Sequence, residues 1–146
     1  MIRDFEFYHG AALAKLIHSK KPVTLRLYPS GSNASYVINE KVGLYLKHSA
    51  NRMSPWHFSF QKKHQNEILE MEKQFGYVVV GLTCYDDGVV GLNYKELKSV
   101  LDEFHEPVEW ISVSRKPRHE YSVKGKDGKL RHKIRRSDFV EKVLNF

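Results

Sequence analysis

The sequence predicts an α/β fold: a mixed sheet with helices on both faces, built on an α-β-β-β-α-β core and followed by further strands and a C-terminal basic β-hairpin. Segments with apolar residues at helical spacing alternate with short runs rich in β-branched and aromatic residues. An apolar share of 41% and an aromatic share of 12% suffice for a packed core. We interpret residues 1–146 as a single domain, because this length is usual for one.

The core begins with a helix and a strand. Residues 9–20 carry apolar side chains at helical spacing, and the helix must end before Pro22. Residues 23–28 then alternate apolar and polar side chains, and the turn-forming run at 29–33 closes this strand.

Two further strands are predicted over residues 35–38 and 42–48, with a short polar connection at 39–41. Side chains alternate between the faces of a strand. Tyr45 and Lys47 are therefore expected on one face.

A helix over residues 64–75 and a strand over 77–84 complete the core. Gly76 stands where a left-handed helix cap is expected. The strand is almost continuously apolar, which is typical of a strand covered on both faces, and we expect it at the centre of the sheet. The aromatic residues that lead into this helix are expected in the core: Trp56, Phe58 and Phe60.

The next helix follows a turn at Asp86-Asp87-Gly88 and a returning strand at 89–92. Asn93 and Glu96 approximate a capping box at its start. Its expected apolar residues are Leu97, Val100, Leu101 and Phe104.

The last elements are a strand at 108–113, a hairpin and a short helix. The hairpin strands are predicted at 121–124 and 129–134, around the turn 125–128. Ser137 is the expected cap of the final helix.

Positive charge is concentrated in this last region. Residues 115–136 contain ten Lys or Arg against two acids, a net charge of +8. Since the whole chain carries +7, the other 124 residues together carry −1. Such a local excess favours a polyanion site, although a hairpin at the edge of a sheet also needs a charged solvent face.

The candidate nucleic-acid-binding residues all lie in the hairpin region. Alternation along its second strand places Lys129, Arg131 and Lys133 on one face, and Leu130, His132 and Ile134 on the packed face. The candidate residues are Lys124, Lys129, Arg131, Lys133, Arg135 and Arg136.

The predicted order of elements between residues 9 and 85, with Tyr45-Leu46-Lys47 on the third strand, resembles the core of the restriction-endonuclease-like fold, the PD-(D/E)xK nucleases. That resemblance implies an acid on the second strand and an acid-x-Lys on the third, which hold a divalent cation at a phosphodiester. Lys47 matches the lysine, whereas Tyr45 replaces the acid and residues 35–39 contain no Asp. The resemblance therefore indicates a non-catalytic relative, with Lys47 as the one candidate catalytic residue.

Other acids and nucleophiles have structural interpretations. Glu6, Glu40 and Asp86-Asp87 are the acids that would have to reach Lys47 in a rearranged nuclease site. We interpret Asp86-Asp87 first as a turn, and Cys84 as an inert buried thiol. No metal site is predicted, because a single cysteine excludes paired-thiolate zinc sites and the histidines have no His-x-x-x-His spacing on a helix.

Nucleic-acid binding, to DNA or RNA, is the leading functional hypothesis. The alternatives are an active metal-dependent DNA nuclease, which alone would require a cofactor, Mg²⁺, and a protein-interaction subunit with an acidic partner. No membrane span is predicted, and the N-terminus lacks the pattern of a secretion signal, so we expect a cytoplasmic protein.

Overall fold

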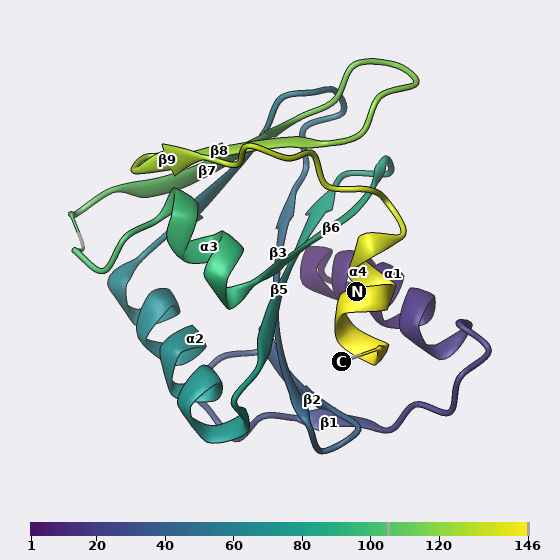
Figure 1. The fold of residues 1–146 in the computed structure, drawn as a ribbon. Helices are drawn as coiled ribbons and strands as arrows, with labels where there is room; N and C mark the ends of the chain where they lie inside the picture. Colours follow the sequence, from purple (N-terminus) through teal and green to yellow (C-terminus); the bar gives the residue numbers. More distant parts are fainter. Residues whose placement is uncertain (105, 146) are drawn as a thin grey trace.

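The computed structural model describes residues 1–104 and 106–145 (Figure 1). The helices are α1 Asp4–Ile17, α2 Lys62–Phe75, α3 Tyr94–Val100 and α4 Asp138–Leu144. The strands are β1 Leu25–Leu27, β2 Ser35–Ile38, β3 Val42–Ser49, β4 Trp56–Phe60, β5 Val78–Cys84, β6 Gly88–Asn93, β7 Glu109–Ser114, β8 Ser122–Gly125 and β9 Gly128–Lys129. The predicted α/β class is confirmed.

The first sheet is mixed and has the strand order β1-β2-β3-β5-β6. Strands β1, β2 and β3 form an antiparallel meander, after which α2 returns the chain so that β5 lies parallel to β3. The central strand is β3. The prediction that 77–84 forms the centre is wrong, because only β6 lies beyond β5, although β5 is buried along its whole length.

Helices cover both faces of this sheet, as predicted. Helices α1 and α4 lie against one face (Figure 1), where Leu16 and Phe139 share an apolar cluster with β-strand residues. Helices α2 and α3 cover the other face, where Ile68 and Val100 belong to a larger cluster that includes the inner side of the second sheet. Among the described residues, no helix has the length and apolarity that crossing a membrane requires.

The second sheet is antiparallel, with the strand order β4-β7-β8-β9. The sequence prediction lacks its first strand, β4, and treats these residues as an approach to α2. Burial alternates along β4, with Trp56, Phe58 and Phe60 buried and His57 and Ser59 exposed. The expected core positions of the aromatic residues are confirmed, and their two-residue period is the signal that would have identified the strand.

Local chain chemistry determines several helix ends. Gly76 has a φ of 73° at the end of α2, which confirms the left-handed cap. The Asn93 side chain accepts the Glu96 N–H at 2.8 Å and Glu96 accepts the Asn93 N–H at 2.9 Å, which confirms the capping box. The expectation that Phe104 lies on the apolar face of α3 is wrong, because the helix ends at Val100 and Phe104 is 81% exposed.

The C-terminal hairpin forms, but its second strand is shorter than predicted. Strands β8 and β9 pair around a turn at 126–127, and Tyr121 and Ile134 form an isolated bridge farther from the turn. Residues 131–133 belong to no strand, while Leu130 and Ile134 are buried as expected.

His132 departs from the predicted packed face. Its side chain is 60% exposed and its Nε2 lies 2.8 Å from Glu96 of α3. The alternation rule fails here because the chain leaves the extended conformation after β9. At the start of α4, Ser137 occupies the cap position but its side chain makes no capping hydrogen bond.

Candidate nucleic-acid interface

The outer face of the second sheet is the surface opposite its core-facing side. Strand pairing aligns four of its residues in one row across all four strands: His57 with Ser112, Ser112 with Lys124, and Lys124 with Lys129. Trp110, Ser114 and Ser122 lie on the same face by alternation along β7 and β8. We call this surface, with Ser59 at its end, the outer face.

The outer face points away from the core because the opposite side of each strand is apolar. Trp56, Ile111, Val113 and Val123 are buried in the larger cluster. Burying that side leaves the alternate residues facing away from the core, so the lysines of β8 and β9 project outward. The register therefore gathers side chains that are distant in sequence.

Three shallow hollows adjoin one another on the outer face. Hollows of about 400, 170 and 330 Å³ share lining residues, with Lys124 and Ser114 common to the first two and Ser114 and Ser122 common to the last two. Trp110 lines the first hollow and Lys133 the last. We call these three adjoining hollows together the outer groove.

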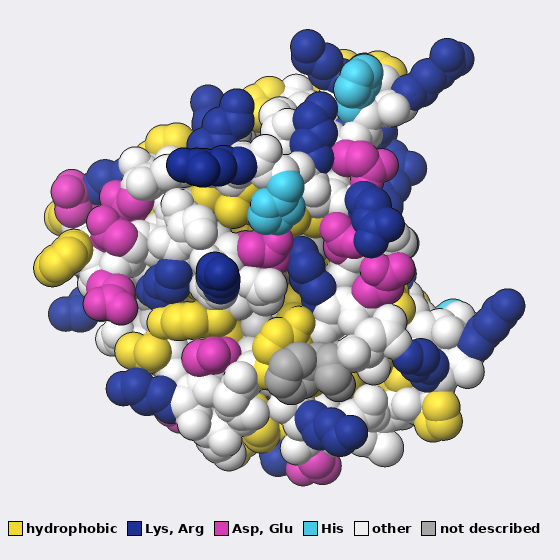
Figure 2. All heavy atoms as spheres, in the orientation of Figure 1, with side chains coloured by type: hydrophobic (Ala, Val, Ile, Leu, Met, Phe, Trp, Pro, Cys, Tyr) yellow, Lys and Arg dark blue, Asp and Glu magenta, His cyan; other side chains and the backbone are white. Residues whose placement is uncertain are grey.

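The charge along the outer groove is mainly positive. It is lined by Lys116, Lys124, Lys129 and Lys133, and in the described part of the chain none of these lysines forms an ion pair. Among the described residues, Glu120 is the one carboxylate that lines it. Figure 2 shows Lys and Arg side chains along the upper side of the molecule, where Figure 1 places β7, β8 and β9.

The six predicted binding residues divide into two groups. Lys124, Lys129, Arg131 and Lys133 are exposed and without a described ion-pair partner. Arg135 instead pairs with Asp138 and Glu141, and Arg136 lies 3.4 Å from Asp87. The last two arginines therefore serve local ion pairs, whereas Lys116, which the prediction omits, belongs to the groove.

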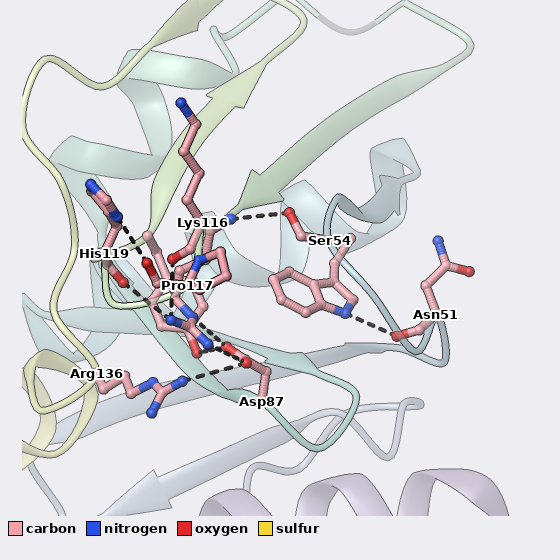
Figure 3. Close-up of polar contacts among 10 residues, drawn as sticks. Asn51, Ser54, Asp87, Lys116, Pro117, His119 and Arg136 are labelled. Carbon is pink, nitrogen blue, oxygen red and sulfur yellow. Dashed lines mark hydrogen bonds and ion pairs between the residues drawn. The ribbon is translucent and has the colours of Figure 1, made fainter.

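A compact ion-pair network supports the loop between β7 and β8. The Arg115 guanidinium donates two hydrogen bonds to Asp87, at 2.9 and 2.8 Å, and the Tyr121 hydroxyl donates to the same carboxylate at 2.6 Å. Figure 3 shows this network and the Lys116 side chain extending away from it. The hydrogen bonds from Arg115 hold the pKa of Asp87 at about 2.

Lys47 lies elsewhere, in a cavity of about 670 Å³ between α1, the chain before β2, β3 and α2. Its ammonium is 3.3 Å from His64 Nδ1 and 4.9 Å from the centre of the Phe60 ring. His64 Nδ1 also accepts the Gln61 N–H at 3.1 Å, so this nitrogen carries no proton and accepts from Lys47 too. Burial lowers the pKa of Lys47 to about 8 and that of His64 to about 4.

Lys47 is therefore a half-buried residue that lines the cavity. The acids that a rearranged nuclease site would need beside Lys47 have other partners. Glu6 pairs with Arg3, Glu40 with Arg26 and Asp87 with Arg115. No carboxylate within residues 1–104 and 106–145 forms an ion pair with the Lys47 ammonium.

Sequence reasoning missed Glu67, the carboxylate that does line this cavity. It accepts hydrogen bonds from Ser32, at 2.7 Å, and from Ser35. The available signal was its helical spacing, three residues after His64 on the helix that packs beside β3. Its partners are serine hydroxyls, so the Lys47 cavity does not reproduce the acid pair of the nuclease pattern.

The remaining predictions about reactive residues agree with the structure. Cys84 is buried, and burial raises the pKa of its thiol, which suits an inert core residue. The chain at 85–87 forms the turn between β5 and β6, as expected for Asp86-Asp87.

Comparisons with known proteins found no matching family model, no matching curated protein and no matching solved structure.

Proposed function

We propose that this protein binds DNA or RNA along the outer groove. The observation that supports the proposal is the set of lysines that line the adjoining hollows of the outer groove and form no ion pair with any described residue. Ammonium groups that contact phosphates release condensed counterions from the nucleic acid, which contributes directly to affinity. In this proposal the protein is a binding protein and not a metal-dependent nuclease, because no carboxylate pair accompanies Lys47 within residues 1–104 and 106–145.

Protection of a sheet edge does not account for the whole pattern. Edge strands often carry lysine to prevent pairing with other chains, and this explains Lys129 on β9. Lys124 lies on β8, which is paired on both sides, and Lys116 and Lys133 lie outside strands. The arrangement follows the groove and not the edge.

Trp110 favours unpaired bases as ligands. It is half-buried on the outer face and lines the same hollow as Lys124 and His57. An aromatic side chain in a basic groove is a stacking platform for the bases of a single strand. The small, exposed side chain of Ser114 leaves room beside this hollow for a nucleic-acid strand to approach the sheet. We therefore expect single-stranded nucleic acid to bind more tightly than duplex of equal length.

The test is a salt titration of binding to single-stranded DNA, single-stranded RNA, duplex DNA and heparin. Changing Lys124, Lys129 and Lys133 together to Glu should weaken binding strongly and reduce the salt slope on duplex DNA by about 2.7, which corresponds to three lost phosphate contacts. Circular dichroism should show a folded protein, since exposed substitutions alter stability by only about 0.5 kcal/mol each.

A matched control carries the same change of net charge on other surfaces. Lys15, Lys41 and Lys73 are exposed on α1, on the β2–β3 connection and on α2. Their joint replacement by Glu should leave most of the affinity intact. If both triple variants lose affinity equally, net charge and not the groove governs binding. Binding to heparin or an acidic peptide, but to no nucleic acid, would favour the acidic-protein alternative.

We also propose a cytoplasmic location. The single cysteine is a buried free thiol, which is compatible with a reducing compartment. Nucleic acid is accessible there to a binding protein of this kind.

A further inference from the structure

Three carboxylates converge beside the turn between β8 and β9. Asp102 follows α3, Glu109 begins β7 and Asp127 lies in the turn, and one oxygen from each lies within 4.8 Å of the others. Figure 2 shows Asp and Glu side chains at the left of the view, where the connection between α3 and β7 lies in Figure 1. We call these three side chains the carboxylate triad.

Backbone N–H groups orient the triad in a consistent way. Asp127 Oδ2 accepts the Asp102 N–H at 3.0 Å, Asp102 Oδ1 accepts the Phe104 N–H at 2.9 Å, and Glu109 Oε1 accepts the Glu106 N–H at 3.1 Å. Each carboxylate thus uses one oxygen to organise the chain. The second oxygen of each has no hydrogen bond among the described residues.

Glu109 is the observation that indicates a ligand. Its side chain is 1% exposed, and its Oε2 is buried without any hydrogen-bond partner in the described structure. A buried carboxylate oxygen without a hydrogen-bond donor is unfavourable, so such groups are almost always paired with a donor or bound to a metal ion. Here the unpartnered oxygen belongs to a side chain that reaches two other carboxylates.

Lys98 and Lys126 lie close enough to the triad to attract its carboxylates, but each ammonium has another direct partner. Lys126 pairs with Glu106, and the Lys98 ammonium donates to Gln65 at 3.3 Å. Neither lysine forms an ion pair with a triad member among the described residues. Three like charges at this separation repel one another, and a cation between them would relieve that repulsion.

We propose that Asp102, Glu109 and Asp127 bind a divalent cation, with Ca²⁺ preferred over Mg²⁺. Ca²⁺ accepts oxygen ligands at about 2.3–2.6 Å, so two oxygens on opposite sides of one ion lie about 4.8 Å apart. The spacing of the triad is within that limit. Mg²⁺ requires about 2.0–2.1 Å and a near-ideal octahedral arrangement, and it gives up its bound water reluctantly, so it is the less favoured ion. Water completes the coordination, since Asp127 is exposed.

The bound cation would join two parts of the chain. Asp102 and Glu109 flank the connection between α3 and β7, whereas Asp127 lies in the turn of the basic hairpin. Because the unfolded chain does not keep these oxygens together, cation binding adds to the stability of the folded hairpin. This inference does not depend on the proposed nucleic-acid function.

The test is isothermal titration calorimetry of the EDTA-treated full chain with Ca²⁺, Mg²⁺ and K⁺, together with thermal unfolding at millimolar concentrations of each salt. We expect one Ca²⁺ site, weaker Mg²⁺ binding and a rise in Tm with Ca²⁺ that K⁺ at equal ionic strength does not reproduce. Glu109→Gln and Asp127→Asn should each lower the Ca²⁺ affinity at least about tenfold. Loss of a residue that only supports a metal ligand typically lowers metal affinity by about 10- to 100-fold, and loss of a ligand should cost no less.

Glu103→Gln is the matched control, because it removes one charge from the same connection without changing the triad. It should keep the Ca²⁺ affinity within about twofold, a difference smaller than loss of a ligand produces. Asp127→Asn keeps the test decisive if Glu109→Gln fails to fold, since Asp127 is exposed. Absence of Ca²⁺ binding in the wild-type chain, or equal affinity in the triad variants, would overturn the proposal. A gain in stability at acidic pH without any Ca²⁺ effect would also overturn it, and would assign a shared proton to the triad.

Discussion

Asp87 connects the β5–β6 turn to the second sheet, and its replacement by Asn should destabilise the protein. The carboxylate accepts hydrogen bonds from Arg115 and Tyr121. The Asn side chain would weaken or remove these hydrogen bonds. The side chains of Asp87 and Arg115 are only 18% and 17% exposed, so solvent screens this ion pair less than a surface pair. We therefore expect a measurable decrease in the free energy of unfolding.

The size of the effect follows from the pKa of Asp87. Its pKa falls from the ordinary value of 3.8 to about 2 in the folded chain, mainly through the hydrogen bonds from Arg115. Each unit corresponds to about 1.4 kcal/mol, so the ionised carboxylate contributes about 2 kcal/mol to the free energy of unfolding at neutral pH. This contribution is fully present above the unfolded-state value and is lost as the pH falls through the folded-state value.

Urea unfolding of the wild-type chain and Asp87→Asn, from pH 7 down to pH 2, measures this contribution. At pH 7 the midpoint of the variant should be lower by about 1 M urea, given a typical m-value of about 2 kcal/mol/M. As the pH falls from about 4 to about 2 the two proteins should converge, because the folded wild-type carboxylate takes up its proton over this range. The neighbouring Asp86→Asn, at an exposed position, should behave like wild type. A stability difference that stays constant at all pH values would refute the electrostatic argument.

Three other predictions concern stability and catalysis. Lys47→Met should raise the free energy of unfolding at pH 7 by about 3 kcal/mol, because burial lowers the folded-state pKa of Lys47 from 10.5 to about 8. Urea titrations should show this gain vanishing as the pH rises from 8 toward 10.5. Gly91→Ala should destabilise by about 1–3 kcal/mol in the same assay, since the added Cβ would lie 2.8 Å from the Phe139 Cα, whereas Gly10→Ala, in open space on α1, should stabilise by about 0.5–1 kcal/mol. With Mg²⁺ or Mn²⁺ the protein should not cleave single-stranded or duplex DNA on gels, and cleavage abolished by Lys47→Ala without unfolding would contradict our interpretation of the Lys47 cavity.

The relation between sequence and structure differs from one candidate site to another. Lys124 and Lys129 were predictable as exposed cations, because strand alternation and local charge depend on neighbouring residues alone. Trp110 and His57 join them only through the pairing of β4 with β7 and of β7 with β8. Strand β4 was predictable from its alternation, but its aromatic residues also suit a core segment that leads into a helix.

Sites formed by residues from different secondary-structure elements could not be predicted from the sequence. Glu67 reaches the Lys47 cavity from α2, and Asp127 meets Asp102 and Glu109 from a turn that follows them in the chain. Side chains far apart in sequence meet when packing fixes the relative position of their elements, and no local pattern records that position. His132 shows the same limit, since the departure of the chain from the strand directs this ring toward Glu96.

The sequence by itself determined the α/β class, the helices that cover both faces of the first sheet, the cap at Gly76 and the location of the positive charge. Each of these follows from apolar periodicity, turn chemistry or composition, which act over a few residues. Only the tertiary structure decided that β3 is central, that the lysines line a groove together with Trp110, and that the buried Glu109, one of whose oxygens has no partner among the described residues, meets Asp102 and Asp127. These features depend on register and on packing between distant segments, whose energies are properties of the whole folded chain.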